Sequence, residues 1–321
     1  MIMLLKLYLI MFITLNPLFS PSPMTFMMLF PSPPPPAKFF NLPFLDPYLN
    51  KDGNFTHGVN FAVAGASALN YSALAMKDIV SLVTNSSLDV QLDWFKSHLN
   101  STFHSISECK ERLAKSLIIM GEIGGNDYNW ELFQRKSISK VYKMVPEVVQ
   151  VIEKAIKEVI SLGATRIVVP GNFPIGCLPV YLAMFETNDP RMYDEQQCLR
   201  YLNMFAKFHN SKIQEIIRQL RNDHPHVTIV YADYFRALKE ILQHATSLGF
   251  GEDVMEIVCC GIGKNEYNFD YDRRCGSEGV IACEHPEKHI SWDGIHLTQN
   301  TYQLMAKWLI THNFKSIVST T

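Results

Sequence analysis

The sequence predicts an α/β protein in which a mostly parallel β-sheet lies between two layers of helices. Four short, nearly continuous apolar runs have the composition of strands that are buried on both faces. Long amphipathic segments between these runs predict helices, and such alternation is typical of a three-layer α/β fold. The chain has 321 residues, of which 47% are apolar and 19% charged, so it is long enough to bury a large core.

The predicted strands end in residues that suit a functional site. They cover residues 58–66, 116–127, 165–177 and 226–234. The first ends near Gly65, and the second ends in Gly124-Gly125-Asn126-Asp127. Because ligands of such sheets bind at the carboxyl ends of the strands, we expect the site at these two tips.

Three helices are predicted where apolar residues recur every three or four positions. They cover residues 140–163, 194–223 and about 299–311. Gly163 ends the first one, because glycine readily adopts the left-handed conformation that follows many helices. The apolar stripe of this helix consists of Val145, Val148, Val149, Ile152, Ile156, Val159 and Ile160.

The first 37 residues differ from the rest, and we divide the chain into a leader (1–37) and one domain (38–321). Lys6 within a run of Leu, Ile, Met and Phe resembles a secretory signal peptide. A membrane anchor is the alternative, because the apolar run approaches spanning length. A third interpretation is an aberrant start of the chain. The Pro-rich run 31–36 predicts an extended linker.

Two further features favour a secreted glycoprotein. Four of the seven Cys lie between Cys259 and Cys283, and disulfides explain them better than zinc, because adjacent Cys rarely bind one tetrahedral metal. Buried free thiols are the alternative. An odd number leaves at least one Cys without an intrachain partner. Candidate glycosylation sites in Asn-X-Ser/Thr triplets are Asn54, Asn70, Asn85 and Asn100.

The charge and the motifs exclude several classes of protein. With 29 basic and 31 acidic residues the net charge is −2, which gives no electrostatic reason to expect nucleic acid or an anionic membrane as partner. The sequence contains no phosphate-binding loop, dinucleotide fingerprint, zinc-protease motif or Gly-X-Ser-X-Gly elbow. We therefore expect no cofactor and no metal.

The stretch SWDGIHLT contains the strongest candidates for catalysis. Asp293 precedes His296 by three residues, a spacing that lets the carboxylate reach the imidazole Nδ1–H in a turn. An Asp that orients a His fixes its tautomer and stabilises the imidazolium that forms when the His accepts a proton. The alternative is an Asp that caps a helix next to an incidental His.

The two strand tips also have two interpretations. Asn126 offers a side-chain N–H, and the backbone N–H of Gly65 is another donor; such groups stabilise the oxyanion of acyl transfer. The alternative for both is a tight turn, for which Gly and Asn are well suited.

Several motifs in order resemble the plant GDSL esterase/lipase family of SGNH hydrolases. They are GVNFAVAGASALN, IGGNDYN, VPGNFPIGCLP, CCGIGKNEYNF and ISWDGIHLTQNTY, and the resemblance covers about residues 39–315. It implies a flavodoxin-like fold, secretion, and cofactor-free hydrolysis of carboxylic esters of small molecules, lipids or polysaccharides. It also implies that Gly65 and Asn126 are the oxyanion-hole residues, and that Asp293 and His296 are the acid and the base.

The first block of that family is absent. The family begins with a strand that ends in Gly-Asp-Ser, whose Ser is the nucleophile, and no Gly-Asp-Ser occurs in this sequence. We therefore expect the first strand to be missing or replaced, with 4–15 as the apolar run that could substitute for it. Three hypotheses follow: an ester hydrolase, a catalytically inactive homologue that binds an ester or glycan, and a truncated gene model.

Overall fold

The computed structural model describes residues 6–9, 45–79, 84–251, 257–314 and 317. Its sheet has five parallel strands in the order β2-β1-β3-β4-β5. The strands are β1 (Lys6–Leu9), β2 (Gly58–Asn60), β3 (Ser116–Ile119), β4 (Arg166–Pro170) and β5 (Thr228–Ala232). The predicted parallel α/β sheet is thus confirmed, although each strand is shorter than the apolar run that predicted it.

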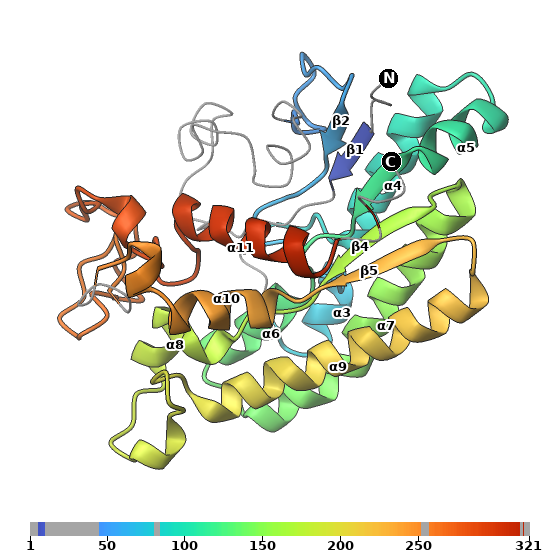
Figure 1. The fold of residues 1–321 in the computed structure, drawn as a ribbon. Helices are drawn as coiled ribbons and strands as arrows, with labels where there is room; N and C mark the ends of the chain where they lie inside the picture. The colour runs from blue at the N-terminus through green and yellow to red at the C-terminus, as the bar shows by residue number, and fades with distance from the viewer. Residues whose placement is uncertain (1–5, 10–44, 80–83, 252–256, 315–316, 318–321) are drawn as a thin grey trace.

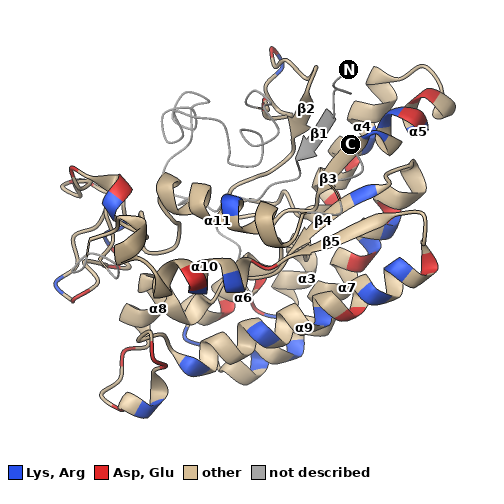
Figure 2. Ribbon diagram, viewed as in Figure 1, with Lys and Arg blue, Asp and Glu red and all other residues tan. Residues whose placement is uncertain are grey.

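Helices cover both faces of the sheet (Figure 1). On one side α7 and α9 pack against each other, and on the other α10 packs against α11. Side chains of both charge signs occur along α7 and α9 (Figure 2). The described α-helices are α3 (Tyr71–Ala75), α4 (Leu88–Thr102), α5 (Ile106–Ala114), α6 (Gly125–Phe133), α7 (Ile138–Leu162), α8 (Pro179–Met184), α9 (Arg200–Asp223), α10 (Tyr234–Gln243) and α11 (Gln299–His312).

The apolar stripe of α7 explains why this helix lies on the sheet. All seven residues of the predicted stripe are at most 8% exposed. Burial of one such side chain contributes roughly 1.5–3 kcal/mol. Gly163 follows the helix with φ 117°, a conformation that a side chain would strain. The predicted helix boundaries at 140–163 and 299–311 therefore differ from the observed ones by one or two residues.

The helix expected at 194–223 begins later than predicted. Helix α9 starts at Arg200, because residues 194–199 form a turn that Asp194 organises. The Asp194 carboxylate accepts hydrogen bonds from the backbone amides of Gln196 and Cys198, at 2.9 and 3.1 Å. Such local bonds from Asp to the backbone compete with helix formation.

The central strand β1 comes from the leader. Its Cα partners are three residues of β2 and four residues of β3. The expected first strand is therefore replaced rather than missing. Strand β1 satisfies backbone groups of β2 and β3 that would otherwise be unpaired in the interior. Most of the leader, including the Pro-rich run 31–36, lies outside the described residues.

Three disulfides confirm the interpretation of the cysteines. They join Cys177 to Cys198, Cys259 to Cys283 and Cys260 to Cys275. The remaining Cys109 on α5 has no disulfide in the part of the chain that the structure describes. The two bridges that start from adjacent Cys lie within the loop-rich segment between α10 and α11, which has few regular elements to stabilise it.

The four glycosylation candidates are accessible, because Asn54, Asn70, Asn85 and Asn100 are all exposed. Asn70 also caps α3, since its Oδ1 accepts the amide N–H of Ala73 at 2.9 Å. Among the helices of the described ranges, none has the length and apolar character needed to cross a membrane.

Removal of β1 tests its role in the sheet. We expect a chain that lacks residues 1–9 to lose about 3–6 kcal/mol of unfolding free energy, at ~1 kcal/mol for each lost ladder hydrogen bond. Total stability of a domain is about 5–15 kcal/mol, so this chain should be marginal. The control lacks only residues 1–5 and keeps β1. Urea unfolding compares the two chains, and equal stability would contradict the assigned strand.

Candidate active site

Asp293 and His296 are hydrogen-bonded to each other. The distance from His296 Nδ1 to Asp293 Oδ2 is 2.6 Å, and the two side chains are 8% and 10% exposed, respectively. The other carboxylate oxygen of Asp293 accepts the amide N–H groups of Ile295 at 3.0 Å and His296 at 2.7 Å. The spacing of three residues therefore brings acid and base together in a turn, outside any helix.

Two further contacts stabilise the turn that contains Asp293 and His296. Gly294 adopts φ 93°, and an added Cβ there would collide with the ring of Phe269. The amide of Trp292 donates to the carbonyl of His296 at 2.8 Å, which closes the turn. Only glycine fits between this backbone and Phe269, so the contact with this ring explains why a glycine occupies position 294 in SWDGIHLT.

The electrostatics of Asp293 favour its charged form. Burial by itself raises the pKa of this carboxyl, but the charge of His296 and the hydrogen bonds from His296 and Ile295 outweigh burial. The pKa therefore lies below its ordinary value. A charged Asp293 orients His296 with Nδ1 toward the carboxylate and leaves Nε2 as the nitrogen for proton transfer.

Gly65 and Asn126 are brought together at the ends of β2 and β3. Gly65 lies in a turn with φ 74°, and the carbonyl of the next residue, Ala66, accepts the Asn126 Nδ2–H at 2.8 Å. Asn126 is in the first turn of α6 and is 7% exposed. The turn interpretation therefore describes Gly65, whereas Asn126 lies at the N-terminus of a helix, and the bond to Ala66 brings the two segments together.

The carboxylate of Asp127 connects helix α6 to the segment that follows Gly65. Its carboxylate accepts the backbone N–H groups of Ala68 and Leu69, each at 2.8 Å, and the side chain is fully buried. Burial raises the pKa of Asp127 to about 7, although the two amides act in the opposite direction. Asp127 thus has a structural role beside Asn126 that its position in the motif does not reveal.

Glu122 is a residue that the sequence interpretation missed. It follows β3, and its Oε1 lies only 2.5 Å from the position that a Cβ on Gly125 would occupy. Burial, and next the charge of Asp127, raise the pKa of Glu122 to about 8. The sequence feature that could have identified Glu122 is an acidic residue directly after an apolar strand, in GEIGGND.

No serine takes the position of the expected nucleophile in the sequence. Strand β1 lies between β2 and β3, and the residues that follow Leu9 in the sequence are Ile10, Met11 and Phe12. Residues 10–44 lie outside the described part of the chain, so the structure places Asp293, His296, Gly65 and Asn126 and says nothing of the serines at 20, 22 and 32.

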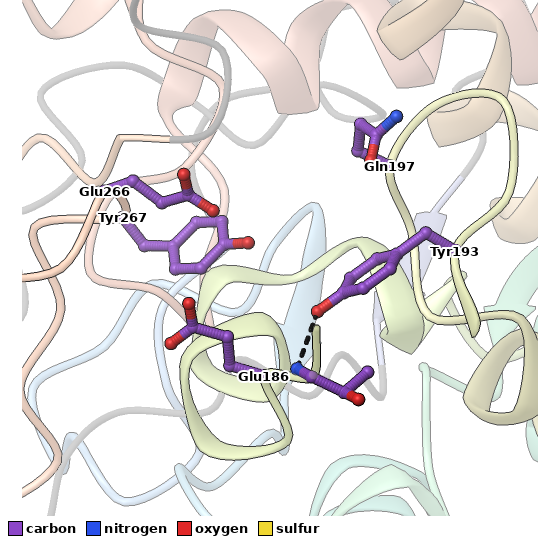
Figure 3. A pocket seen from close by; sticks show the side chains of 6 residues that line it. Glu186, Tyr193, Gln197, Glu266 and Tyr267 are labelled. Atoms are coloured by element: carbon purple, nitrogen blue, oxygen red, sulfur yellow. Dashed lines mark hydrogen bonds between the residues drawn. The ribbon is translucent and has the colours of Figure 1, made fainter. Parts of the chain in front are cut away.

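A separate pocket of about 230 Å³ opens between the segment after α8 and the disulfide-rich loop (Figure 3). The carboxylates of Glu186 and Glu266 line it with Tyr193, and the Tyr193 hydroxyl accepts the Thr187 amide at 3.1 Å. None of the four predicted site residues lines this pocket, so it is distinct from the candidate active site.

The substitution Asp293→Asn tests the charge of the dyad. We expect a loss of about 1.5–3 kcal/mol at pH 7, typical of hydrogen bonds to a charged group. Because the folded pKa is lowered, this contribution is complete above the unfolded pKa of about 3.9 and disappears as the pH falls through the folded value. Urea unfolding should therefore show a difference that shrinks in acid, and a constant difference would contradict the assignment.

The substitution Glu122→Gln should have the opposite pH dependence. The folded pKa of Glu122 is raised, so wild-type stability falls as the pH rises from about 4.3 toward 8. Gln avoids this loss, and its advantage in urea unfolding should be larger at pH 8.5 than at pH 5. The matched control is Glu111→Gln, because Lys115 lowers the pKa of exposed Glu111. The same trend in both variants would refute the raised pKa.

Comparisons with known proteins identify the family of the chain. The family model of the GDSL-like lipase/acylhydrolases matches residues 33–309. A GDSL esterase/lipase of Arabidopsis thaliana is 43% identical over 276 residues, which are 85% of this chain and 68% of the relative. Sinapine esterase of Brassica napus is also 43% identical, over 85% of this chain and 71% of the relative. Acetylajmalan esterase 1 of Rauvolfia serpentina is 41% identical, over 88% of this chain and 73% of the relative.

The names of these relatives describe carboxylic ester hydrolases, and the matched region contains Asp293, His296, Gly65 and Asn126. From its sequence, its parallel sheet and this match, the chain belongs to the GDSL-like lipase/acylhydrolase family.

Proposed function

We propose that the protein hydrolyses a carboxylic ester with His296 as general base and Asp293 as the acid that orients it. The 2.6 Å hydrogen bond between these two buried side chains is the observation that supports this most. In the same proposal the Gly65 N–H and the Asn126 side chain stabilise the oxyanion, because both are donors beyond the carboxyl ends of β2 and β3, the two strands that flank β1.

In this proposal the nucleophile is water, because no Gly-Asp-Ser motif supplies the serine. His296 Nε2 takes a proton from water as the water oxygen bonds to the ester carbonyl carbon. The negative oxygen of the tetrahedral intermediate is held by Gly65 and Asn126. The bond to the alcohol oxygen then breaks, and His296 returns the proton to the leaving alcohol. Because this route lacks the serine nucleophile of an intact triad, we expect hydrolysis to be slow.

An inactive homologue that binds an ester or glycan is the second candidate. It is favoured by one observation, namely that Gly-Asp-Ser occurs nowhere in the 321 residues. A truncated gene model explains the same observation, and a transcript that encodes Gly-Asp-Ser upstream of residue 38 would identify it.

The substrate class and the cellular location are proposed from the relatives and from general features of the chain. The names sinapine esterase and acetylajmalan esterase favour a small-molecule ester over a polysaccharide ester for this chain. Three disulfides and four exposed glycosylation candidates favour an extracellular location. We keep residues 38–321 as the hydrolase domain and add β1 to it, since Lys6–Leu9 complete the sheet.

The substitution His296→Ala tests the proposed base. With a short p-nitrophenyl ester we expect a low wild-type rate that falls a further 10²–10⁴-fold, the usual contribution of a general base. The matched control is His312→Ala, because His312 lies at the exposed end of α11 and bonds to Trp308 O. Wild-type hydrolysis that survives His296→Ala would reject the mechanism. A folded wild type without hydrolysis would favour the inactive homologue.

A further inference from the structure

Helix α8 contacts both halves of the candidate active site. The amide of Val180 donates to the carbonyl of Gly294, in the turn of the dyad, at 3.0 Å. The hydroxyl of the next residue, Tyr181, donates a short hydrogen bond to Asn129 Oδ1 in α6. Two consecutive residues of one short helix therefore bind the loop of Asp293 and the helix of Asn126.

The bond to Asn129 continues to Asn126. Asn129 Nδ2 donates to Asn126 Oδ1 at 3.4 Å, and Asn126 Nδ2 donates to Ala66 O at 2.8 Å. The Asn129 amide uses its oxygen for Tyr181 and its nitrogen for Asn126. The Ala66 carbonyl can only accept, so Asn126 presents its Oδ1 to Asn129 Nδ2. Asn129 Oδ1 then faces Tyr181, whose phenol can donate or accept and acts here as the donor.

This orientation matters for an oxyanion donor. If the Asn126 amide were flipped, its oxygen would face the Ala66 carbonyl and its nitrogen would face Asn129 Nδ2, which are two unfavourable contacts. In the observed orientation one Nδ2–H is bonded to Ala66, and the second N–H of the same group is the one that can meet an oxyanion.

The surroundings of Tyr181 keep the chain rigid and the phenol protonated. Tyr181 is 1% exposed, and its ring stacks on Phe133 with centroids 5.8 Å apart. Burial, and next the charges of Glu122 and Tyr271, raise the pKa of Tyr181. The Cys177–Cys198 disulfide lies immediately before α8, and the Leu199 amide donates to Gly176 O at 2.8 Å, so the start of the helix is fixed as well.

We propose that Tyr181 and Asn129 are positioning residues that hold the Asn126 amide in the orientation of an oxyanion donor, while Val180 ties the same helix to the dyad turn. The inference rests on the proposed oxyanion role of Asn126. It concerns the order of one side chain, and this order can be measured whether or not the chain turns over an ester.

Solvent exchange of the Asn126 side-chain amide protons measures that order. Selective ¹⁵N-Asn labelling makes the signals visible, and Asn126→Asp assigns them. We expect exchange to be faster by on the order of tenfold in Tyr181→Phe and in Asn129→Leu, the factor that corresponds to one lost hydrogen bond. If the wild type hydrolyses an ester, kcat should fall in both variants with KM nearly unchanged.

The matched control is Tyr128→Phe. Tyr128 is a buried tyrosine of the same helix α6, and its hydroxyl bonds to His209 Nδ1 at 2.9 Å, away from Asn126. Exchange at Asn126 should keep its wild-type rate in this variant. Unchanged exchange in Tyr181→Phe and Asn129→Leu, or an equal increase in Tyr128→Phe, would overturn the proposal. Loss of the fold in both test variants would also overturn it, because the residues would then support the domain in general. Absence of hydrolysis in the wild type with the expected exchange rates would refute the proposed function alone.

Discussion

The backbone groups between β2 and β3 must be paired by a strand that lies between them, and β1 is that strand. The position of the candidate active site depends on this pairing. Strands β2 and β3 carry Gly65 and Asn126 just beyond their ends, but in the sheet they are neighbours of β1 and not of each other. Four residues of the leader supply the backbone groups that keep the two strands in register. If the same leader were cleaved as a signal peptide, the central strand would leave with it, so the two roles exclude each other in one molecule.

Buried carboxylates then fix the loops that the sheet presents. Asp293 and Asp127 each accept two backbone amides, the first within its own turn and the second from residues about sixty positions earlier in the chain. Only Asp293 also binds a titratable side chain, His296. The same physical device therefore serves a loop connection in one place and the orientation of a base in the other.

The parts of the site that depend on short-range spacing could be predicted from the sequence. Asp293 and His296 are three residues apart, so a turn with Gly294 is enough to bring the carboxylate to the imidazole. The strand Lys6–Leu9 could be predicted only as a possible use of the apolar run 4–15, because such a run near the start has the composition of a signal peptide as well as of a strand. The raised pKa of Glu122 could not be predicted either, since it depends on burial and on the fold bringing Asp127 close.

The adjacent cysteines have a consequence for how the protein is handled. The amides of Cys259 and Cys260 donate to the carbonyls of Ser291 and Trp292, at 3.1 and 2.6 Å, immediately before Asp293. Two residues that form disulfides, Cys259 and Cys260, are thus hydrogen-bonded to the backbone next to Asp293. Protein made in a reducing cytosol, or stored with a thiol reagent, lacks these disulfides. None of the disulfide-bonded cysteines lies in a strand, so the sheet forms without them. Preparations of equal helix content can therefore differ in the geometry of the dyad, and thiol titration separates them.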